Sequence, residues 1–188
     1  MTIQGGEGPE GTTAKVWPPP SADQQTAGSY GITVVSTPAS GGGLGDFGVF
    51  EEEPVFTVFI NMATAANPNT PSWTLEYAPL HAGDSSGGKT TPPFPSEKVT
   101  PVWPADLAAR YRSQLAVVFI AIDEAGKVQR VKMMQSPSIA LNATLLTAIS
   151  EWQFHPASQN SKPIAVRALI GVPVWAPAGP VATSARAR

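Results

Sequence analysis

The side chains that could carry catalysis or hold a metal ion are few and widely separated. The chain has no cysteine, and its two histidines, His81 and His155, lie 74 positions apart, so local sequence does not assemble a zinc site. Glu51, Glu52 and Glu53 would point to alternate faces of an extended segment, which is typical of a solvated turn and not of a calcium site. No serine lies in the strand–turn–helix context that activates a nucleophile. We therefore expect no enzyme activity, no catalytic residue, no metal site and no cofactor.

Two short motifs resemble nucleotide-binding signatures in their letters alone. Gly43, Gly45 and Gly48 have the spacing of a dinucleotide-binding loop, which needs a helix directly after the glycines to hold the pyrophosphate. The sequence instead continues into three glutamates and Pro54. The Asp-Phe-Gly tripeptide that begins at Asp46 spells a kinase magnesium motif, but the other kinase motifs are absent from the sequence. Both features indicate a glycine-rich turn.

The composition predicts a globular protein that neither binds nucleic acid nor spans a membrane. The 188 residues carry a formal net charge of -2, with 42% hydrophobic and 14% charged residues, so the chain can form a core. Phosphate binding needs a basic face, which a near-neutral chain does not suggest. The longest apolar run, Leu115–Ile122, is far shorter than the ~20 residues of a membrane helix. No export signal begins this sequence, so membrane association would depend on an anchor outside this chain.

Charge is divided unevenly between the two halves of the chain. Up to residue 100 there are 3 basic and 10 acidic residues, and from residue 101 onward there are 9 basic and 4 acidic residues. The halves should therefore attract each other, or the basic half should face an acidic partner. A third interpretation is that both are solvated faces, because exposed ion pairs contribute little to stability.

Breaks rich in glycine, proline and serine divide the chain into five parts. We predict flexible tails at 1–28 and 179–188, a small antiparallel β segment at 29–81, a linker at 82–97 and a second domain at 98–178. Period-two alternation places strands of the β segment at 32–34, 56–62 and 73–77. The linker is the expected boundary between the two halves.

The second domain has the predicted element order α, β, β, α, β. The elements are a helix at Pro104–Arg112, a hairpin of Leu115–Ile122 and Lys127–Gln135 with its turn at Asp123–Gly126, and a last strand at Ile164–Trp175. Between the hairpin and the last strand, a helix capped by Asn142 places Leu145, Ala148, Ile149 and Trp152 on one buried face. The predicted fold class is α+β, a three-stranded antiparallel sheet with two helices on one face, preceded by the small β segment.

Two features of the strands indicate what should contact them. Both faces of Leu115–Ile122 are apolar, so the face away from the helices should be covered by the N-terminal strands or by a second copy of the chain. Pro173 lacks the backbone N–H that a ladder requires, which indicates that the last strand lies at a sheet edge. An edge strand has unpaired backbone groups that could accept a strand from a partner.

Four short motifs, taken in order, resemble one known family. They are Pro101-Val102-Trp103-Pro104, Asp123-Glu124-Ala125-Gly126, Trp152-Gln153-Phe154-His155-Pro156-Ala157 and Val172-Pro173-Val174-Trp175. Through them, the segment 101–175 resembles the C-terminal domain of TonB-type energy-transducing proteins. It departs from the family at Trp103, where tyrosine is usual, and at Ser113-Gln114, where glycines are usual. The Pro/Glu/Lys-rich spacer of such transducers is also missing from this sequence.

The resemblance implies a periplasmic protein–protein interaction domain that supports energy-dependent transport, with any inner-membrane anchor outside this chain. Its partner would be a peptide from the plug of an outer-membrane TonB-dependent receptor, added as a strand to the last strand of the domain. The partner-binding residues so implied are Trp103 and Pro104, which would flank the site, and Ile164, Val166, Ala168, Ile170, Val172 and Val174 along the strand.

Two other functions are open at this point. The same fold could be a structural or dimerisation module of a larger envelope protein, which forms a homodimer without coupling to any receptor. It could also be a sensory module of a larger membrane protein whose N-terminal strands carry a ligand site.

Overall fold

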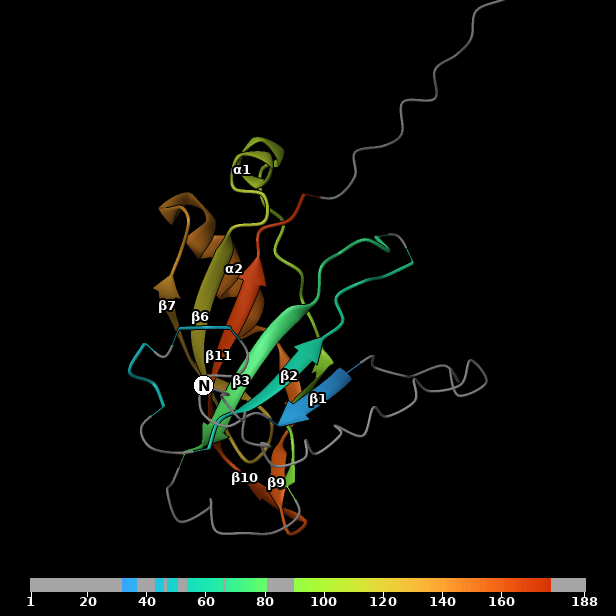
Figure 1. Cartoon of the computed structure of the whole chain (residues 1–188), viewed down its shortest axis with the longest axis vertical. Helices are drawn as coiled ribbons and strands as arrows, with labels where there is room; N and C mark the ends of the chain where they lie inside the picture. Colours follow the sequence, from blue (N-terminus) through green and yellow to red (C-terminus); the bar gives the residue numbers. More distant parts are fainter. Residues whose placement is uncertain are drawn as a thin grey trace, which may run out of the picture. The chain divides into compact units, whose positions relative to one another are not determined.

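The central element of the structure, a computed structural model, is an antiparallel sheet of six strands (Figure 1). The structure describes residues 32–36, 43–45, 47–50, 54–65, 67–80 and 90–176, all within one compact unit. In spatial order the strands are β1 (Ile32–Ser36), β2 (Phe56–Ile60), β3 (Trp73–Pro79), β11 (Val166–Pro173), β6 (Leu115–Ile122) and β7 (Val128–Gln135). The predicted tails, His81, the three glutamates at 51–53 and Asp46 lie outside the described residues.

The sheet is larger than predicted because the N-terminal strands join it. β3 pairs with β11, so the β segment expected at 29–81 extends the sheet of the second domain. The alternation of Trp73, Leu75 and Tyr77 gives β3 an apolar face, which is buried in the main core. The predicted α+β class with antiparallel strands and two helices is confirmed, whereas the three-stranded sheet is wrong.

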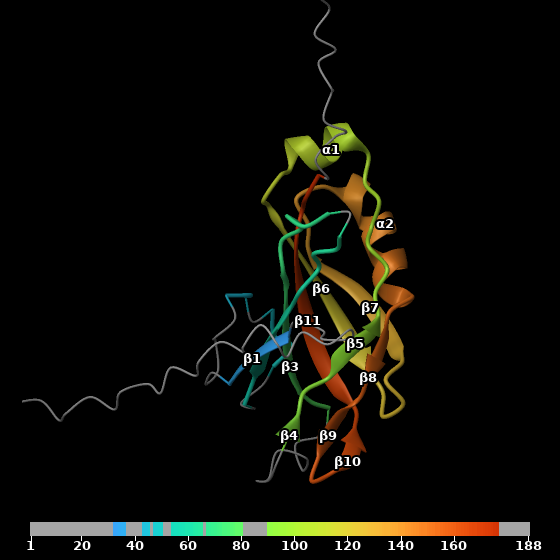
Figure 2. The same cartoon turned by 90° about the vertical axis from the view of Figure 1, so that its right-hand side faces the viewer.

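The two helices do not share one face of the sheet. α2 (Ile139–Ser150) lies across one face, whereas α1 (Ala105–Arg110) lies beyond the ends of the strands (Figure 2). The predicted cap Asn142 is wrong, since α2 begins after Ser138. The earlier start adds Leu141 to the buried face of the helix, which offsets the loss of Asn142 as a cap. Among the described residues, neither helix has the length and apolar character needed to cross a membrane.

Two smaller sheets connect residues 90–97 with the segment that follows α2. β5 (Phe94–Glu97) pairs with β8 (Gln153–His155), while β4 (Thr90–Thr91) and β10 (Lys162–Ile164) pair with the two sides of β9 (Ala157–Gln159). Figure 2 shows β4, β9 and β10 together at one end of the large sheet. Residues 90–97 therefore form strands, although the sequence places them in a linker, because their backbone groups find partners more than fifty residues away.

The main core lies between α2 and the sheet. Trp152 is fully buried, and its ring stacks on that of Trp73 with ring centroids 5.1 Å apart. The Trp152 Nε1 donates a hydrogen bond of 2.9 Å to the carbonyl oxygen of Val99. The predicted stripe of α2, which includes Leu145 and Ile149, is buried as expected.

The opposite face of the sheet is covered by residues that precede β2. Leu44, Phe50 and Val55 form a second buried cluster with Leu169 and its neighbours on the sheet. The backbone N–H of Leu44 donates a buried hydrogen bond of 3.3 Å to Oε1 of Glu76. The prediction that the N-terminal strands cover this face is wrong, because β1, β2 and β3 extend the same sheet; Leu44, Phe50 and Val55 form the described cover instead.

Asp123 fixes the turn between β6 and β7. Its Oδ1 accepts hydrogen bonds from the N–H groups of Ala125 and Lys127 at 2.9 and 2.8 Å, and its Oδ2 accepts one from Gln129 at 2.6 Å. Burial alone would raise the pKa of Asp123, but these hydrogen bonds outweigh it and the pKa is lowered. The stabilisation is therefore present above the unfolded pKa of 3.8 and is lost as the pH falls through the folded pKa.

We expect Gly126→Ala, in the same turn, to destabilise the domain clearly more than Gly48→Ala. Both glycines have a positive φ, +80° and +66°, so alanine strains either backbone by about 1 kcal/mol. A Cβ at Gly126 would also collide with the carbonyl oxygen of Phe154, whereas one at Gly48 would meet open space. Urea unfolding followed by tryptophan fluorescence measures both changes, and equal losses would contradict the packing of this turn.

Candidate functional site

The strand predicted to bind a partner, β11, lies inside the sheet. Ala168 pairs with Tyr77 of β3 on one side and with Ile120 of β6 on the other. The pairing with β3 runs from Val166 to Gly171. The prediction that the last strand has a free edge is therefore wrong, because β3 already occupies the position that an incoming strand would take.

The side chains of the predicted partner-binding strand belong to the core. The buried ones are Val166, Ala168, Ile170, Val172 and Val174. The first four belong to the core between the sheet and α2, and none of the five has surface to offer a partner. Ile164 lies in a different strand, β10, and is buried as well.

Pro173 is compatible with an interior strand because β3 has already ended there. β3 pairs with β11 as far as Gly171, whereas β6 continues to pair as far as Pro173. The next N–H, that of Val174, donates a hydrogen bond of 2.8 Å to the carbonyl oxygen of Gln114 on the β6 side. Successive backbone groups alternate in direction, so the missing N–H of Pro173 faces the β3 side, beyond the last β3 pair. The proline marks the end of a neighbouring strand and not a free edge.

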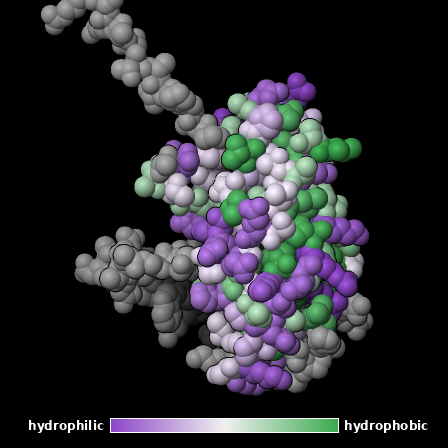
Figure 3. All heavy atoms as spheres, turned by 180° about the vertical axis from the view of Figure 1, so that it is seen from behind, coloured by the Kyte–Doolittle hydropathy of each residue, from purple (hydrophilic) through white to green (hydrophobic). Residues whose placement is uncertain are grey.

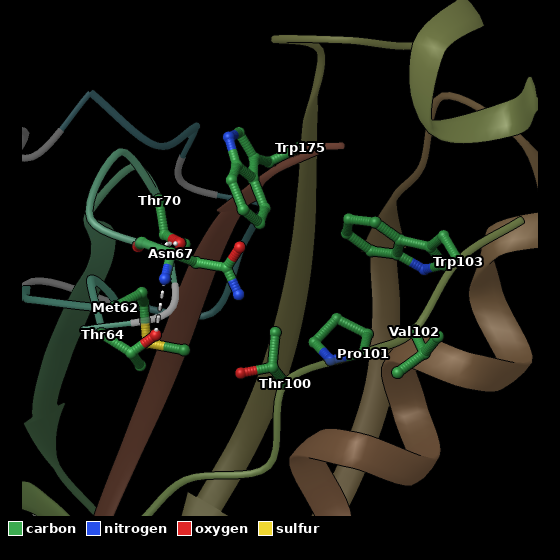
Figure 4. Close-up of a pocket in the computed structure, with 9 residues that line it drawn as sticks. All are labelled: Met62, Thr64, Asn67, Thr70, Thr100, Pro101, Val102, Trp103 and Trp175. Atoms are coloured by element: carbon green, nitrogen blue, oxygen red, sulfur yellow. Dashed lines mark hydrogen bonds between the residues drawn. The ribbon is translucent and has the colours of Figure 1, made fainter. Parts of the chain in front are cut away.

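Trp103 lines a groove next to this end of the sheet, which we call the tryptophan groove (Figure 4). The loop between β2 and β3, the segment before α1 and the residue that follows Val174 together form it. Its lining residues are Met62, Thr64, Asn67, Thr70, Thr100, Pro101, Val102, Trp103 and Trp175. The groove has a volume of about 240 Å³.

The two tryptophans reach the groove from segments far apart in the sequence. Figure 4 shows the rings of Trp103 and Trp175 on two sides of the space, with the side-chain amide of Asn67 directed into it. Both rings are half-buried, so part of each stays accessible. Pro104, the second residue predicted to flank a partner site, is exposed at the start of α1.

Hydrogen bonds hold the walls of the groove in place. Asn67 and Thr64 exchange two backbone hydrogen bonds of 3.0 and 3.2 Å, and the Thr70 hydroxyl donates one of 2.9 Å to the Asn67 carbonyl oxygen. The Lys98 Nζ donates a hydrogen bond of 2.7 Å to the carbonyl oxygen of Asn61, which joins the segments leading into the two walls. Burial lowers the pKa of Lys98. These hydrogen bonds order the loop between β2 and β3 and join it to the segment before α1.

The lining of the groove is uncharged. None of its 9 residues is acidic, basic or a histidine. Its chemistry consists of indole rings, a thioether, aliphatic groups, hydroxyls and one amide, which suits binding better than acid–base or nucleophilic catalysis. Elsewhere in the part of the chain that the structure describes, no cluster of three or more His, Asp or Glu side chains could hold a metal ion.

Sequence reasoning found Trp103 but missed Trp175, Asn67 and the rest of the groove. Trp103 stands in a motif, whereas the other walls come together only through the pairing of β3 with β11. One signal for that pairing was available, since the run Ala168–Val172 is apolar without interruption. Such a run is typical of a strand covered on both faces and bordered on both sides.

The structure is a helix-backed antiparallel domain with an uncharged groove beside one end of its large sheet. Residues 99–173 match the family described as Gram-negative bacterial TonB protein C-terminal. The resemblance predicted from the four motifs is thus confirmed over this segment. The family is one of protein-interaction domains and not of enzymes. No curated protein matches the chain.

Proposed function

We propose that the chain is an interaction domain of the bacterial envelope that couples to a peptide of an outer-membrane receptor in the periplasm and supports energy-dependent transport. The observation that carries the proposal is the family match at residues 99–173, which covers α1, the hairpin, α2 and β11. Outer-membrane receptors are the partners of such domains. Any membrane anchor would be supplied by a segment outside this chain.

The partner peptide binds at the tryptophan groove and not along β11. Trp103, one of the two residues predicted to flank the partner strand, lines the groove, and the other, Pro104, follows it in the sequence. Strand addition at β11 is ruled out by β3, which pairs with it over six residues. A peptide that contacts two indole rings gains affinity from buried aromatic surface instead of ladder hydrogen bonds.

Titration of the full chain with synthetic peptides from the N-termini of receptor plugs tests the proposal. We expect saturable binding by calorimetry that weakens at least ~10-fold in Trp103→Ala, because a buried indole anchor is removed. The matched control is Ile139→Ala, a change at a residue 88% exposed at the start of α2, which should leave binding unchanged. Absence of binding by any plug peptide would contradict the proposal.

A dimerisation module is the second candidate, and one observation favours it. α2 contains no charged residue, and the exposed surface near it includes Ile139 and Val102, which are 88% and 84% exposed. Figure 3, which views the molecule from behind, shows hydrophobic atoms gathered in patches on this side. Sedimentation separates the candidates: a monomer supports receptor coupling, whereas a tight dimer that Ile139→Asp dissociates supports the module.

A further inference from the structure

We propose that the tryptophan groove binds an uncharged, proline-rich segment of the partner in the polyproline II conformation. The inference rests on the proposed function, since it names the class of peptide that the same groove takes. Four observations carry it: the pairing of β3 with β11 as far as Gly171, the two indole rings, the Asn67 amide and the neutral lining.

The neighbouring strands offer little free ladder to a ligand that binds as a strand. β3 and β11 pair with each other from Val166 to Gly171, so an incoming strand could pair with β11 only beyond Gly171, where β3 has ended. A β-type peptide relies on a longer ladder for its affinity, whereas a polyproline II peptide has no ladder to complete and docks through its side chains. The second conformation therefore fits this site better.

The aromatic walls match the flat surface of proline rings. Trp103 and Trp175 present their rings from two sides, and the buried residues Pro101 and Met62 complete the apolar lining. Grooves lined by aromatic rings are the usual docking sites of proline-rich segments, because that helix is already ordered and loses little entropy on binding.

The polar groups of the groove match the backbone carbonyls of such a segment, which have no internal hydrogen bonds. The Asn67 amide points into the space in Figure 4, while the hydrogen bonds that fix its loop use its backbone N–H and carbonyl oxygen. The Trp103 Nε1 is buried with no hydrogen-bond acceptor among the described residues. Presenting this N–H to a ligand carbonyl would therefore break no existing bond.

Charge complementarity selects an uncharged segment. None of the lining residues is ionisable, so an acidic or basic motif would lose solvation without gaining a partner. The rival ligand is a glycan, which can also stack on tryptophan. Its many hydroxyl groups need several planar polar side chains, whereas the lining offers one amide.

Titration of the full chain with an acetylated, amidated decaproline peptide tests the inference. The indole N–H signals of the tryptophans in ¹⁵N-labelled protein serve as the readout, which requires no variant to fold. We expect saturable shifts of the Trp103 and Trp175 signals, with Trp73 and Trp152 unaffected because they are buried in the core. A glycine–serine peptide of equal length and a chitin oligosaccharide are the comparison ligands, and neither should shift these signals.

Variants then place the binding in the groove. Trp175→Ala should weaken decaproline binding at least ~10-fold and Asn67→Ala about 3- to 10-fold, in line with the loss of an aromatic anchor and of a hydrogen bond. Ile139→Ala is the matched control and should have no effect. The inference is overturned if decaproline does not bind, if the glycine–serine peptide binds equally well, or if only the oligosaccharide binds. Binding of receptor-plug peptides without decaproline binding would refute this inference while leaving the proposed function standing.

Discussion

Replacing Leu169 by proline is expected to destabilise the domain by about 4 kcal/mol or more. Leu169 is fully buried in β11, between Glu76 of β3 and Phe119 of β6. The substitution removes the large side chain, which costs about 2–5 kcal/mol, and leaves a ladder partner unpaired, which costs about 1–3 kcal/mol. Such a loss is a large share of the roughly 5–15 kcal/mol that keeps a domain folded.

Lys132→Pro is the matched control, because Lys132 pairs with the same Phe119 but lies on the outermost strand, β7. Proline at Lys132 also removes a ladder donor, but the side chain that it replaces is exposed, so no cavity forms. Urea unfolding should therefore show a much smaller loss for Lys132→Pro than for Leu169→Pro. A Leu169→Pro protein as stable as the control variant would refute the interior position of β11.

Trp152→Ala is expected to reduce the free energy of unfolding by about 3–5 kcal/mol. The Trp152 side chain is 0% exposed and stacks on Trp73, with an angle of 11° between the ring planes. Its removal leaves a large cavity between α2 and the sheet, which the rigid stacking surface of Trp73 cannot fill. Chemical unfolding followed by circular dichroism measures the loss, and a change below about 1 kcal/mol would mean that this packing is wrong.

The milder change Trp152→Phe separates packing from the hydrogen bond to Val99. Phenylalanine keeps most of the aromatic contact but cannot donate to the Val99 carbonyl oxygen, so we expect a loss nearer 1 kcal/mol from the missing bond, plus a smaller packing term. Val99 begins the segment that carries Trp103, so this variant should also weaken ligand binding at the tryptophan groove. Unchanged affinity would show that the segment is held by other contacts.

Local patterns were sufficient to predict the hairpin and the buried face of α2. The hairpin of β6 and β7, its turn at Asp123–Gly126 and the buried stripe of α2 each depend on residues close together in the sequence. The start of α2 was wrong because the helix begins after Ser138 without a side-chain cap, and the first turn buries Leu141. Errors of this kind shift an element by one turn and leave the fold intact.

The position of β11 could not be predicted in the same way, because it depends on a pairing between strands about ninety residues apart. Pro173 pointed to an edge, but it only marks the place where β3 ends. The groove was missed for the same reason, since Asn67, Trp103 and Trp175 meet only when that pairing forms. Trp103 and Trp175 each lie in one of the four motifs, but no local pattern places them beside Asn67, so the candidate site depends on the topology of the sheet.

Amide hydrogen exchange of β11 in the free chain tests whether this strand lies inside the sheet. If β3 and β6 border β11 on both sides, every amide from Arg167 to Val172 should exchange slowly, at rates set by opening of the whole domain. Protection of alternate amides only, as expected of a strand with one open side, would show that β11 has a free edge and would restore strand addition as the mode of binding.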